Sequence, residues 1–232
     1  MLVVVTREAG RNDALRDWLG PATIVEVPLT STTYRPLPEV ETDLARAGER
    51  GPFAVLVVTS ARSRNYLEAA RRVCARDLEV WTVGPATSGA VTDAGLAVTG
   101  EAPSALEVAR RLDHGPVLAL GAREMRGELA HELSARAISV ETVACYETVP
   151  LEPNEAARAV IASADAVVIG APSAWRVARA LVPPATWVVV PGETTAAAVR
   201  ADHDRVLVGW RTEVTRHLEA LVAGERSSPG AQ

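Results

Sequence analysis

The sequence contains no lysine, and all 24 of its basic residues are arginine. Without a primary amine on a side chain, the protein cannot form the Schiff base of a pyridoxal enzyme. It also cannot build a phosphate-binding loop that depends on lysine. A compositional bias toward arginine is the simplest explanation of the absence. Both enzyme classes are excluded whatever its cause.

Cysteine is scarce, and long hydrophobic or basic runs are missing. Cys74 and Cys145 form no CxxC pair, so we expect two reduced, half-buried thiols. No apolar stretch approaches the ~20 residues of a membrane helix, and the first residues, MLVVVTREAG, lack the basic start of a signal peptide. The net charge is -5, and no basic stripe carries aromatic residues. We therefore expect a cytoplasmic protein, most simply a monomer, that binds neither nucleic acid nor membranes.

Other common site motifs are also missing. The sequence has no GxGxxG for a dinucleotide and no GxSxG for a Ser-His-Asp hydrolase. Its histidines have no ligand spacing, so we expect them on the surface and predict no metal site. These histidines are His114, His131, His203 and His217.

Short apolar runs alternate with segments whose apolar residues recur three and four positions apart. Runs such as VLVV and AVVI are continuous, which is typical of parallel strands covered on both faces. The pattern predicts βαβ units and a doubly wound α/β fold. Strands are expected at residues 2–6, 23–27, 53–59, 79–83, 96–98, 116–120, 138–144, 165–169, 187–190 and 205–208. Helices are expected at residues 61–75, 128–135 and 212–222.

The sequence repeats itself at an offset of about 110 residues. LVVVTREAGRNDAL resembles VLALGAREMRGEL, AVLVVTSARSRNYLEAA resembles AVVIGAPSAWRVARAL, and VWTVGPATSGAV resembles WVVVPGETTAAAV. The first strand pair is repeated at the end of the middle block, so one five-stranded domain is inserted in the other.

The repeat predicts the domain boundaries. One domain comprises residues 1–33 plus 149–232, and the inserted domain comprises residues 36–145. The connecting segments, residues 28–36 and 145–153, are short and rich in threonine and proline, and we expect them to lie side by side as a two-stranded linker. The tail GERSSPGAQ is expected to be disordered.

Several turns together resemble the uroporphyrinogen-III synthase family, in the family's order and over nearly the whole chain. The matching residues are Thr6-Arg7, Thr59-Ser60, Val83-Gly84 with Thr87, Gly121 with Arg123, Tyr146 with Thr148, Pro172-Ser173, and Gly192 with Thr195. The chain departs from the family at Gly170-Ala171, where a hydroxyl residue usually precedes the Pro-Ser pair.

The resemblance implies two α/β domains with the active site in the cleft between them. It also implies that the linear tetrapyrrole hydroxymethylbilane loses water, inverts ring D and closes to uroporphyrinogen III, with no metal or organic cofactor. Tyr146 would be catalytic, assisting the loss of water. Substrate would be bound by Arg7, Thr59, Ser60, Gly84, Thr87, Ser104, Arg123, Ser173, Gly192 and Thr195.

Plainer roles remain open for these residues. Serine and threonine at strand-to-helix turns are ordinary helix caps, although a cap at a cleft can also present N–H groups to an anion. Tyr146 can be a packing residue of the linker. Arg7 and Arg123 can bind substrate carboxylates, or can pair with neighbouring acids such as Glu8 and Glu124.

Two other functions compete with ring closure. One is a non-catalytic binding protein or paralogue of the same fold that binds an anionic small molecule, which the missing hydroxyl at Gly170-Ala171 favours. The other is a regulatory module related to receiver domains. It predicts clustered aspartates after the first strand, where only Glu8 and Asp13 occur, so we discount it.

Overall fold

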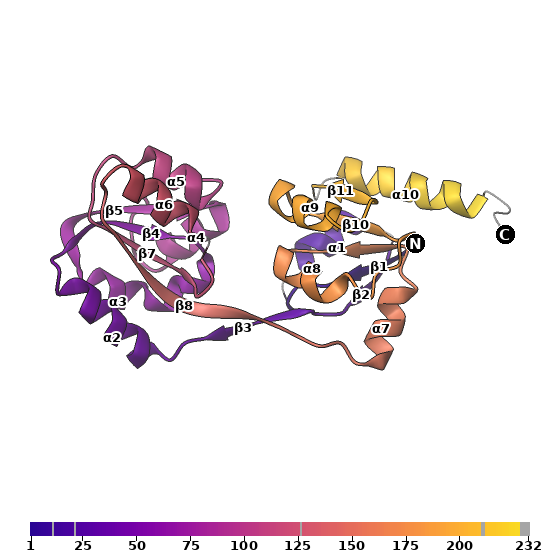
Figure 1. Ribbon diagram of the computed structural model, residues 1–232, viewed down its shortest axis with the longest axis horizontal. Helices are drawn as coiled ribbons and strands as arrows, with labels where there is room; N and C mark the ends of the chain where they lie inside the picture. Colours follow the sequence, from indigo (N-terminus) through magenta and orange to yellow (C-terminus); the bar gives the residue numbers. More distant parts are fainter. Residues whose placement is uncertain (11, 21, 126, 210–211, 228–232) are drawn as a thin grey trace. The chain divides into compact units, whose positions relative to one another are not determined.

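The computed structural model describes residues 1–10, 12–20, 22–125, 127–209 and 212–227. The chain divides into two compact units, each with its own sheet (Figure 1). The first unit comprises residues 1–31 and 149–232, and the second comprises residues 32–148.

The first unit contains a five-stranded sheet with the order β11-β10-β9-β1-β2. Every described pairing in it is parallel. Its strands are β1 (Leu2–Val5), β2 (Thr23–Glu26), β9 (Ala166–Val168), β10 (Trp187–Val190) and β11 (Val206–Val208).

The second unit contains a six-stranded sheet with the order β3-β8-β7-β4-β5-β6. The pairings from β8 to β6 are parallel. Its strands are β3 (Thr30–Tyr34), β4 (Phe53–Val58), β5 (Cys74–Val83), β6 (Gly100–Ala102), β7 (Val117–Ala122) and β8 (Val140–Pro150). The predicted α/β fold with parallel sheets is confirmed.

Helices cover both faces of the first sheet because alternate strand residues point to opposite sides. Val4 and Val167 pack on one side with residues of α7 (Glu155–Ala162), α8 (Pro172–Ala178) and α9 (Glu193–Arg200). Val3 and Val168 pack on the other side with α1 (Asp13–Leu19) and α10 (Thr212–Ser227). This two-sided burial explains the continuous apolar runs.

The second sheet is covered in the same way. Leu56 and Val58 pack with α2 (Leu37–Gly48), α3 (Leu67–Arg71) and α4 (Pro85–Asp93). Val55 and Val57 pack with α5 (Ala105–Arg111) and α6 (Glu128–Ala135). In Figure 1, α5 and α6 lie above these strands, and α2 and α3 lie below them.

The internal repeat is visible in the topology. The order β11-β10-β9-β1-β2 corresponds strand for strand to β6-β5-β4-β7-β8. The helices correspond too, because α8 and α9 share one face in the first unit, as α3 and α4 do in the second. The added strand is β3, so the second sheet has six strands where the sequence predicted five.

Two strand predictions were wrong in position. The predicted strand at residues 96–98 lies outside the sheet, and β6 begins at Gly100 instead. Gly95 has a φ of +82°, which turns the chain, and Leu96 and Val98 pack on the core as loop residues. The predicted helix 61–75 is a 3₁₀ segment η1 (Ala61–Tyr66) followed by α3, and β5 begins at Cys74, five residues earlier than predicted.

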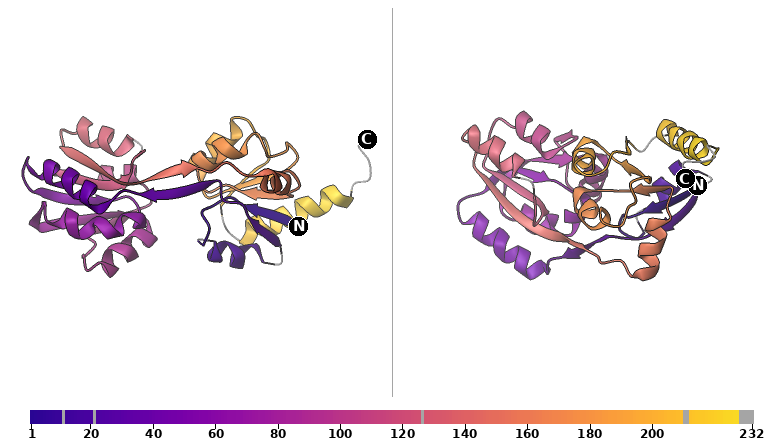
Figure 2. Two further views of the ribbon diagram at one scale, coloured as in Figure 1. Left: turned by 90° about the horizontal axis from the view of Figure 1, so that it is seen from below. Right: turned by 45° about the vertical axis from the view of Figure 1, so that its right-hand side comes forward.

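The two connecting segments both contain strand residues. β3 lies next to β8 in the second sheet, and the two can be followed in Figure 2. The Arg35 N–H donates to the Cys145 carbonyl at 3.0 Å, and the Leu151 N–H donates to the Leu29 carbonyl at 2.9 Å. Because the residue numbers rise on one strand and fall on the other, β3 and β8 are antiparallel. The predicted two-stranded linker is therefore present.

Two further expectations need correction. Helix α10 continues to Ser227, so residues 224–227 of the predicted disordered tail are helical, while residues 228–232 lie outside the described residues. His203 is buried and bonded to the Thr186 carbonyl at 2.8 Å, whereas the other three histidines are exposed. Sequence spacing cannot distinguish these two histidine environments.

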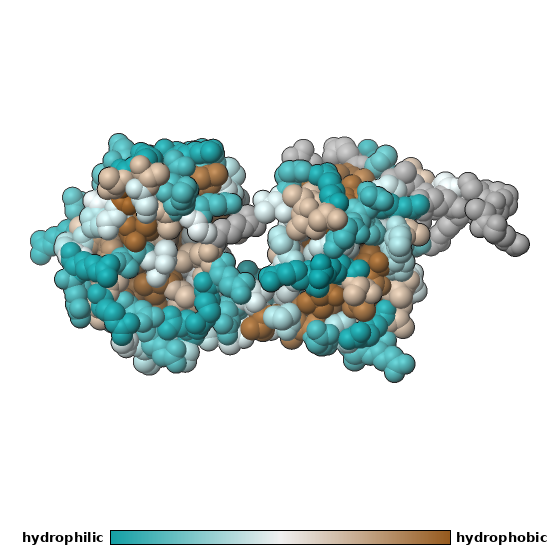
Figure 3. All heavy atoms as spheres, in the orientation of Figure 1, coloured by the Kyte–Doolittle hydropathy of each residue, from teal (hydrophilic) through white to brown (hydrophobic). Residues whose placement is uncertain are grey.

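Hydrophilic residues cover most of the face of each unit drawn in Figure 3. Among the described residues, none of the helices combines the length and the apolar character needed to cross a bilayer.

Candidate functional site

The residues predicted to bind substrate follow the carboxyl ends of parallel strands, where ligands bind in open α/β sheets. In the first unit, Arg7 follows β1, Ser173 follows β9, and Gly192 and Thr195 follow β10. Because these strands are parallel neighbours, the turns lie at one edge of the sheet.

The second unit repeats the arrangement. Thr59 and Ser60 follow β4, Gly84 follows β5, Ser104 follows β6, and Arg123 follows β7. These strands are again parallel neighbours, so the sheet gathers the turns at its carboxyl edge.

Two helices at these edges begin at glycine. Gly84 is the N-cap of α4, and Gly192 is the N-cap of α9; neither has a side chain to bond the first N–H groups. Gly84 has a φ of +76°, a left-handed conformation that favours glycine. The first-turn N–H groups and the positive end of the helix dipole suit a carboxylate.

Several predicted hydroxyl residues have structural partners. Ser60 accepts a hydrogen bond from the Arg62 N–H at 3.3 Å and caps η1, and Ser104 accepts one from the Glu107 N–H at 3.2 Å and caps α5. The Thr59 hydroxyl donates to the Leu120 carbonyl at 2.9 Å. Both serines therefore cap a helix, as the plainer interpretation expects. The turns that they cap still lie at the carboxyl edge of the sheet.

Thr87 and Thr195 occupy equivalent positions in α4 and α9, and both are buried. The Thr87 N–H donates to the Gly84 carbonyl at 3.0 Å, and the Thr195 N–H donates to the Gly192 carbonyl at 3.1 Å. The two threonines therefore close the first turn of their helices.

Gly170 lies against the Arg7 side chain. A Cβ atom added at Gly170 would lie 2.9 Å from Arg7 Cγ, which is too close for an unstrained contact. A hydroxyl residue at position 170 would therefore clash with Arg7, which is consistent with glycine at this turn. Ala171 is the N-cap of α8 and supplies no side-chain hydrogen bond, and Ser173 lies in the first turn of that helix.

Tyr146 lies in β8 and is 6% exposed. Its ring belongs to the core cluster that contains Val58 and Leu120. The ring centroid of Tyr34 lies 6.3 Å away, and the guanidinium of Arg62 lies 5.6 Å from the Tyr146 centroid. Packing thus fixes the ring, as the plainer interpretation of this residue expects.

Arg123 is tied to the strand of Tyr146. Its backbone N–H donates to the Tyr146 carbonyl at 2.7 Å, and its Nε lies 3.0 Å from Glu147 Oε2. The acid that pairs with Arg123 is thus Glu147 of β8, where the sequence suggested Glu124. The Arg123 side chain is 59% exposed, so its charge remains accessible to an anion.

Both cysteines are free thiols. Burial raises the pKa of Cys74 to about 11 and the pKa of Cys145 to about 11, so both stay protonated at neutral pH. Within the part of the chain that the structure describes, no three His, Cys, Asp or Glu side chains are grouped to hold a metal ion.

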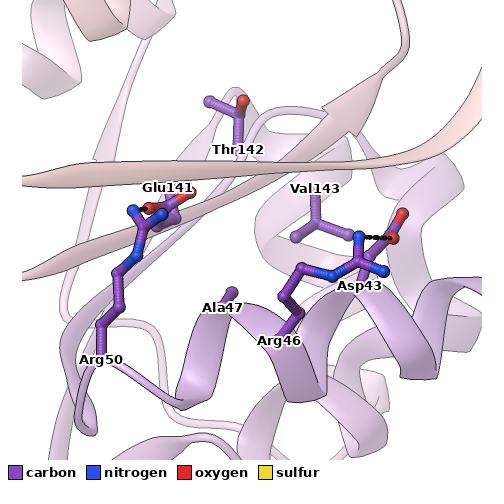
Figure 4. Close-up of a pocket in the computed structure, with 7 residues that line it drawn as sticks. All are labelled: Asp43, Arg46, Ala47, Arg50, Glu141, Thr142 and Val143. Atoms are coloured by element: carbon purple, nitrogen blue, oxygen red, sulfur yellow. Dashed lines mark hydrogen bonds and ion pairs between the residues drawn. The ribbon is translucent and has the colours of Figure 1, made fainter.

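A pocket of about 210 Å³ lies between α2 and β8 (Figure 4). Its charged residues pair with one another: Arg46 with Asp43 at 3.5 Å, and Arg50 with Glu141. None of the residues predicted from the sequence lines it.

Two arginines near Tyr146, Arg35 and Arg62, are not marked as site residues by the sequence. Arg62 lies two residues after Ser60, and its guanidinium lies over the Tyr146 ring. Arg35 is bonded to β8 by both its main chain and its side chain. Their positions in the sequence were the available signal, because Arg62 follows the predicted Thr59-Ser60 turn and Arg35 lies in a predicted linker segment.

Comparison with known proteins identifies relatives of the whole fold. The family model of uroporphyrinogen-III synthase HemD matches residues 17–211. A search of curated protein sequences gave no match.

Three solved structures share the fold. A mutant uroporphyrinogen III synthase of Thermus thermophilus has 14% identity and a TM-score of 0.66, over 98% of this chain and 100% of that one. The wild-type enzyme of that organism has 16% identity and a TM-score of 0.51, over 97% and 98%. The synthetase of Helicobacter pylori has 15% identity and a TM-score of 0.59, over 95% and 98%.

The structural likeness establishes the fold, and the family model establishes the relationship. That model spans most of both units, from α1 to the residues before α10. The chain therefore belongs to the uroporphyrinogen-III synthase family of enzymes.

Proposed function

We propose that the protein cyclises hydroxymethylbilane to uroporphyrinogen III, with loss of water and inversion of ring D, in a cleft between its two units. Membership of the family supports a small-molecule tetrapyrrole substrate. In this proposal the protein acts as a cytoplasmic monomer without a cofactor.

The observation that carries the proposal is the matched pair of helices with a glycine N-cap. α4 in one unit and α9 in the other both begin at glycine, at the carboxyl edges of their sheets. A linear tetrapyrrole with eight carboxylates has acidic groups at both ends, so two such edges can each hold a part of it. Holding the two ends close together supplies much of the catalysis, because orientation alone can contribute several kcal/mol, roughly 7–11 in the best cases.

Tyr146 has the chemistry to assist the first step. Its phenol hydroxyl can donate a hydrogen bond to the leaving hydroxyl of the substrate. The contacts with Tyr34 and Arg62 fix its ring. Arg7 and Arg123 contribute positive charge at equivalent turns of the two units, in keeping with an anionic substrate.

The isomer composition of the product tests the proposal. Purified protein is incubated with hydroxymethylbilane, the product is oxidised, and the type I and type III porphyrins are separated by chromatography. We expect the type III isomer to dominate. Formation of the type I isomer alone, at the spontaneous rate, would overturn the enzymatic proposal.

The second candidate is a non-catalytic protein or paralogue that binds an anionic small molecule. The observation that favours it is the start of α8, where Gly170 and Ala171 supply no hydroxyl. Tyr146→Phe separates the two candidates. A catalyst should lose turnover with little change in affinity for substrate, whereas a binding protein should keep its affinity and have no turnover to lose.

A further inference from the structure

All three tyrosines of the chain lie in the second unit, and two of them contact the residues around Tyr146. Tyr34 ends β3 and packs against Tyr146. Tyr66 ends η1, the segment that starts after Thr59-Ser60. Arg35, the residue after Tyr34, is bonded to both β8 and Tyr66.

Arg35 holds two consecutive carbonyl groups of β8. Its backbone N–H donates to the Cys145 carbonyl at 3.0 Å. Its guanidinium Nη1 donates to the Ala144 carbonyl at 2.9 Å. These are the two residues that precede Tyr146, so Arg35 fixes the strand just before the tyrosine.

The backbone carbonyl of Arg35 is also hydrogen-bonded. The Tyr66 hydroxyl donates to it at 2.7 Å. Tyr66 is buried, and burial raises the pKa of its phenol, so the hydroxyl remains a donor. Because Tyr66 belongs to η1, this bond links Arg35 to the segment that follows Thr59 and Ser60, and η1 also carries Arg62, whose guanidinium lies over the Tyr146 ring.

Helix α2 holds the guanidinium in place. Asp43 Oδ2 lies 2.8 Å from Nη1 of Arg35, and Glu39 Oε2 lies 3.6 Å from Nη2. The hydrogen bond to Asp43 is the main reason that the pKa of Arg35 is raised. The Arg35 side chain is 16% exposed, so this pair is better shielded from water than the surface pairs of the unit. The planar fork of arginine can serve a carboxylate and a carbonyl together, which the single ammonium of lysine does poorly.

We propose that Arg35 is a positioning residue, which holds Tyr146 in place relative to the Thr59-Ser60 turn for the ring-closing reaction. The proposal rests on the proposed function, because the role of Tyr146 at the reacting atoms belongs to it. A displacement of about 1 Å at a catalytic group can cost up to roughly 100-fold in rate. Loss of the Arg35 contacts should therefore lower kcat more than it changes KM.

The test is a double-mutant cycle on kcat with Arg35→Lys and Tyr146→Phe. We expect Arg35→Lys alone to lower kcat about tenfold with KM changed less than about threefold. In the Tyr146→Phe protein, adding Arg35→Lys should lower kcat no further, because Arg35 acts through the tyrosine hydroxyl. Arg72→Lys is the matched control, since Arg72 also pairs with two carboxylates, Glu41 and Glu68, and should retain full activity.

Milder variants keep the test decisive if Arg35→Lys fails to fold, which a thermal melt would reveal. Tyr66→Phe removes one hydroxyl and its bond to Arg35, and Asp43→Asn weakens the hold on the guanidinium. Each should lower kcat severalfold in the native protein and have no effect in the Tyr146→Phe protein.

The possible failures can be distinguished. The positioning role is overturned if Arg35→Lys lowers kcat by the same factor in the Tyr146→Phe protein as in the native protein. It is also overturned if Arg35 variants have unchanged kcat. Neither result affects the proposed function. A fully active Tyr146→Phe protein overturns the role of the tyrosine and with it the positioning role. A wild-type protein that yields only the type I isomer overturns the proposed function itself.

Discussion

The backbone N–H of Arg123 donates a hydrogen bond to the carbonyl oxygen of Tyr146, with 2.7 Å between nitrogen and oxygen. This bond joins the turn after β7 to the strand that carries the tyrosine. The Arg123 side chain forms an ion pair with Glu147, its one ion-pair partner among the described residues. The main chain and the side chain of Arg123 can therefore be tested separately.

Replacing Arg123 by Ala should raise KM for hydroxymethylbilane about tenfold with little change in kcat, because the guanidinium is proposed to bind a substrate carboxylate. Thermal stability should change little, since exposed ion pairs contribute about 0–1 kcal/mol. Steady-state kinetics and a thermal melt check both expectations. Arg110→Ala, which breaks a comparable exposed pair with Glu107 on α5, is the control and should leave KM unchanged. An unchanged KM for Arg123→Ala would remove this residue from the site.

Gly121→Ala should destabilise the second unit. An added Cβ would collide with Thr59 Oγ1 and would lie 2.6 Å from Met125 Sδ. Relief of this clash requires Thr59 to give up its bond to Leu120, so we expect a loss of about 1–3 kcal/mol. Urea unfolding measures the change. Gly127→Ala is the matched control because no neighbouring atom lies within 4 Å of its added Cβ, and equal stabilities of the two variants would contradict the prediction.

Gly170→Ser adds a hydroxyl to the turn before Pro172-Ser173, where the family usually has one, yet it should impair this protein. The added Cβ would press on Arg7 Cγ at 2.9 Å, which should cost about 1 kcal/mol or more of unfolding free energy. KM should also rise if Arg7 binds substrate. In an Arg7→Ala background the same serine should cost little, because the clashing atom is gone. Equal penalties in both backgrounds, measured by urea unfolding, would show that Arg7 is not the obstacle.

His114 should make a small, pH-dependent contribution to stability. Its ring Nδ1 lies 2.8 Å from Asp113 Oδ1, and this hydrogen bond is the main reason that the pKa of His114 is raised above 6.5. A raised pKa means that the folded state binds the proton more tightly than the unfolded state. The stabilisation is therefore complete below about pH 6.5 and is lost as the pH rises through the higher folded value.

His114→Gln should accordingly destabilise the protein more at about pH 5.5 than at about pH 8.5. The effect should stay below about 1 kcal/mol, because the His114 side chain is 45% exposed. Urea unfolding at the two pH values measures it. In an Asp113→Asn background the pH dependence should largely disappear. A larger loss of unfolding free energy at about pH 8.5 than at about pH 5.5 would contradict the prediction.

Burial on both faces made the inner strands predictable. Val55–Val58 and Val3–Val5 form continuous apolar runs, and the structure places both in buried parallel strands. β3 was missed as a strand of the second sheet because its sequence, TSTTY, has no apolar run, and main-chain bonds to β8 hold it at the edge. The apolar residues around Leu96 suggested a strand, although they pack as a loop.

The candidate site was predictable where residue identity marks it and hidden where backbone groups form it. Glycines and hydroxyl residues after strands can be recognised in a sequence. Arg35 could not be, because its guanidinium bonds to a carbonyl 109 residues away, and every residue has a carbonyl. Likewise, Asp43 and Glu39 both pair with Arg35, although acidic residues on a helix are mostly exposed to solvent.

The duplicated strand order has a genetic consequence. The second unit is encoded by one uninterrupted stretch, β4 to β8, while its counterpart in the first unit is encoded as β9 to β11 followed by β1 and β2 from the other end of the chain. The two units are thus circular permutants of each other. A gene rearranged to begin at α2, with β1, β2 and β3 placed after α10, would encode the ten strands that the two units share as a plain tandem duplication.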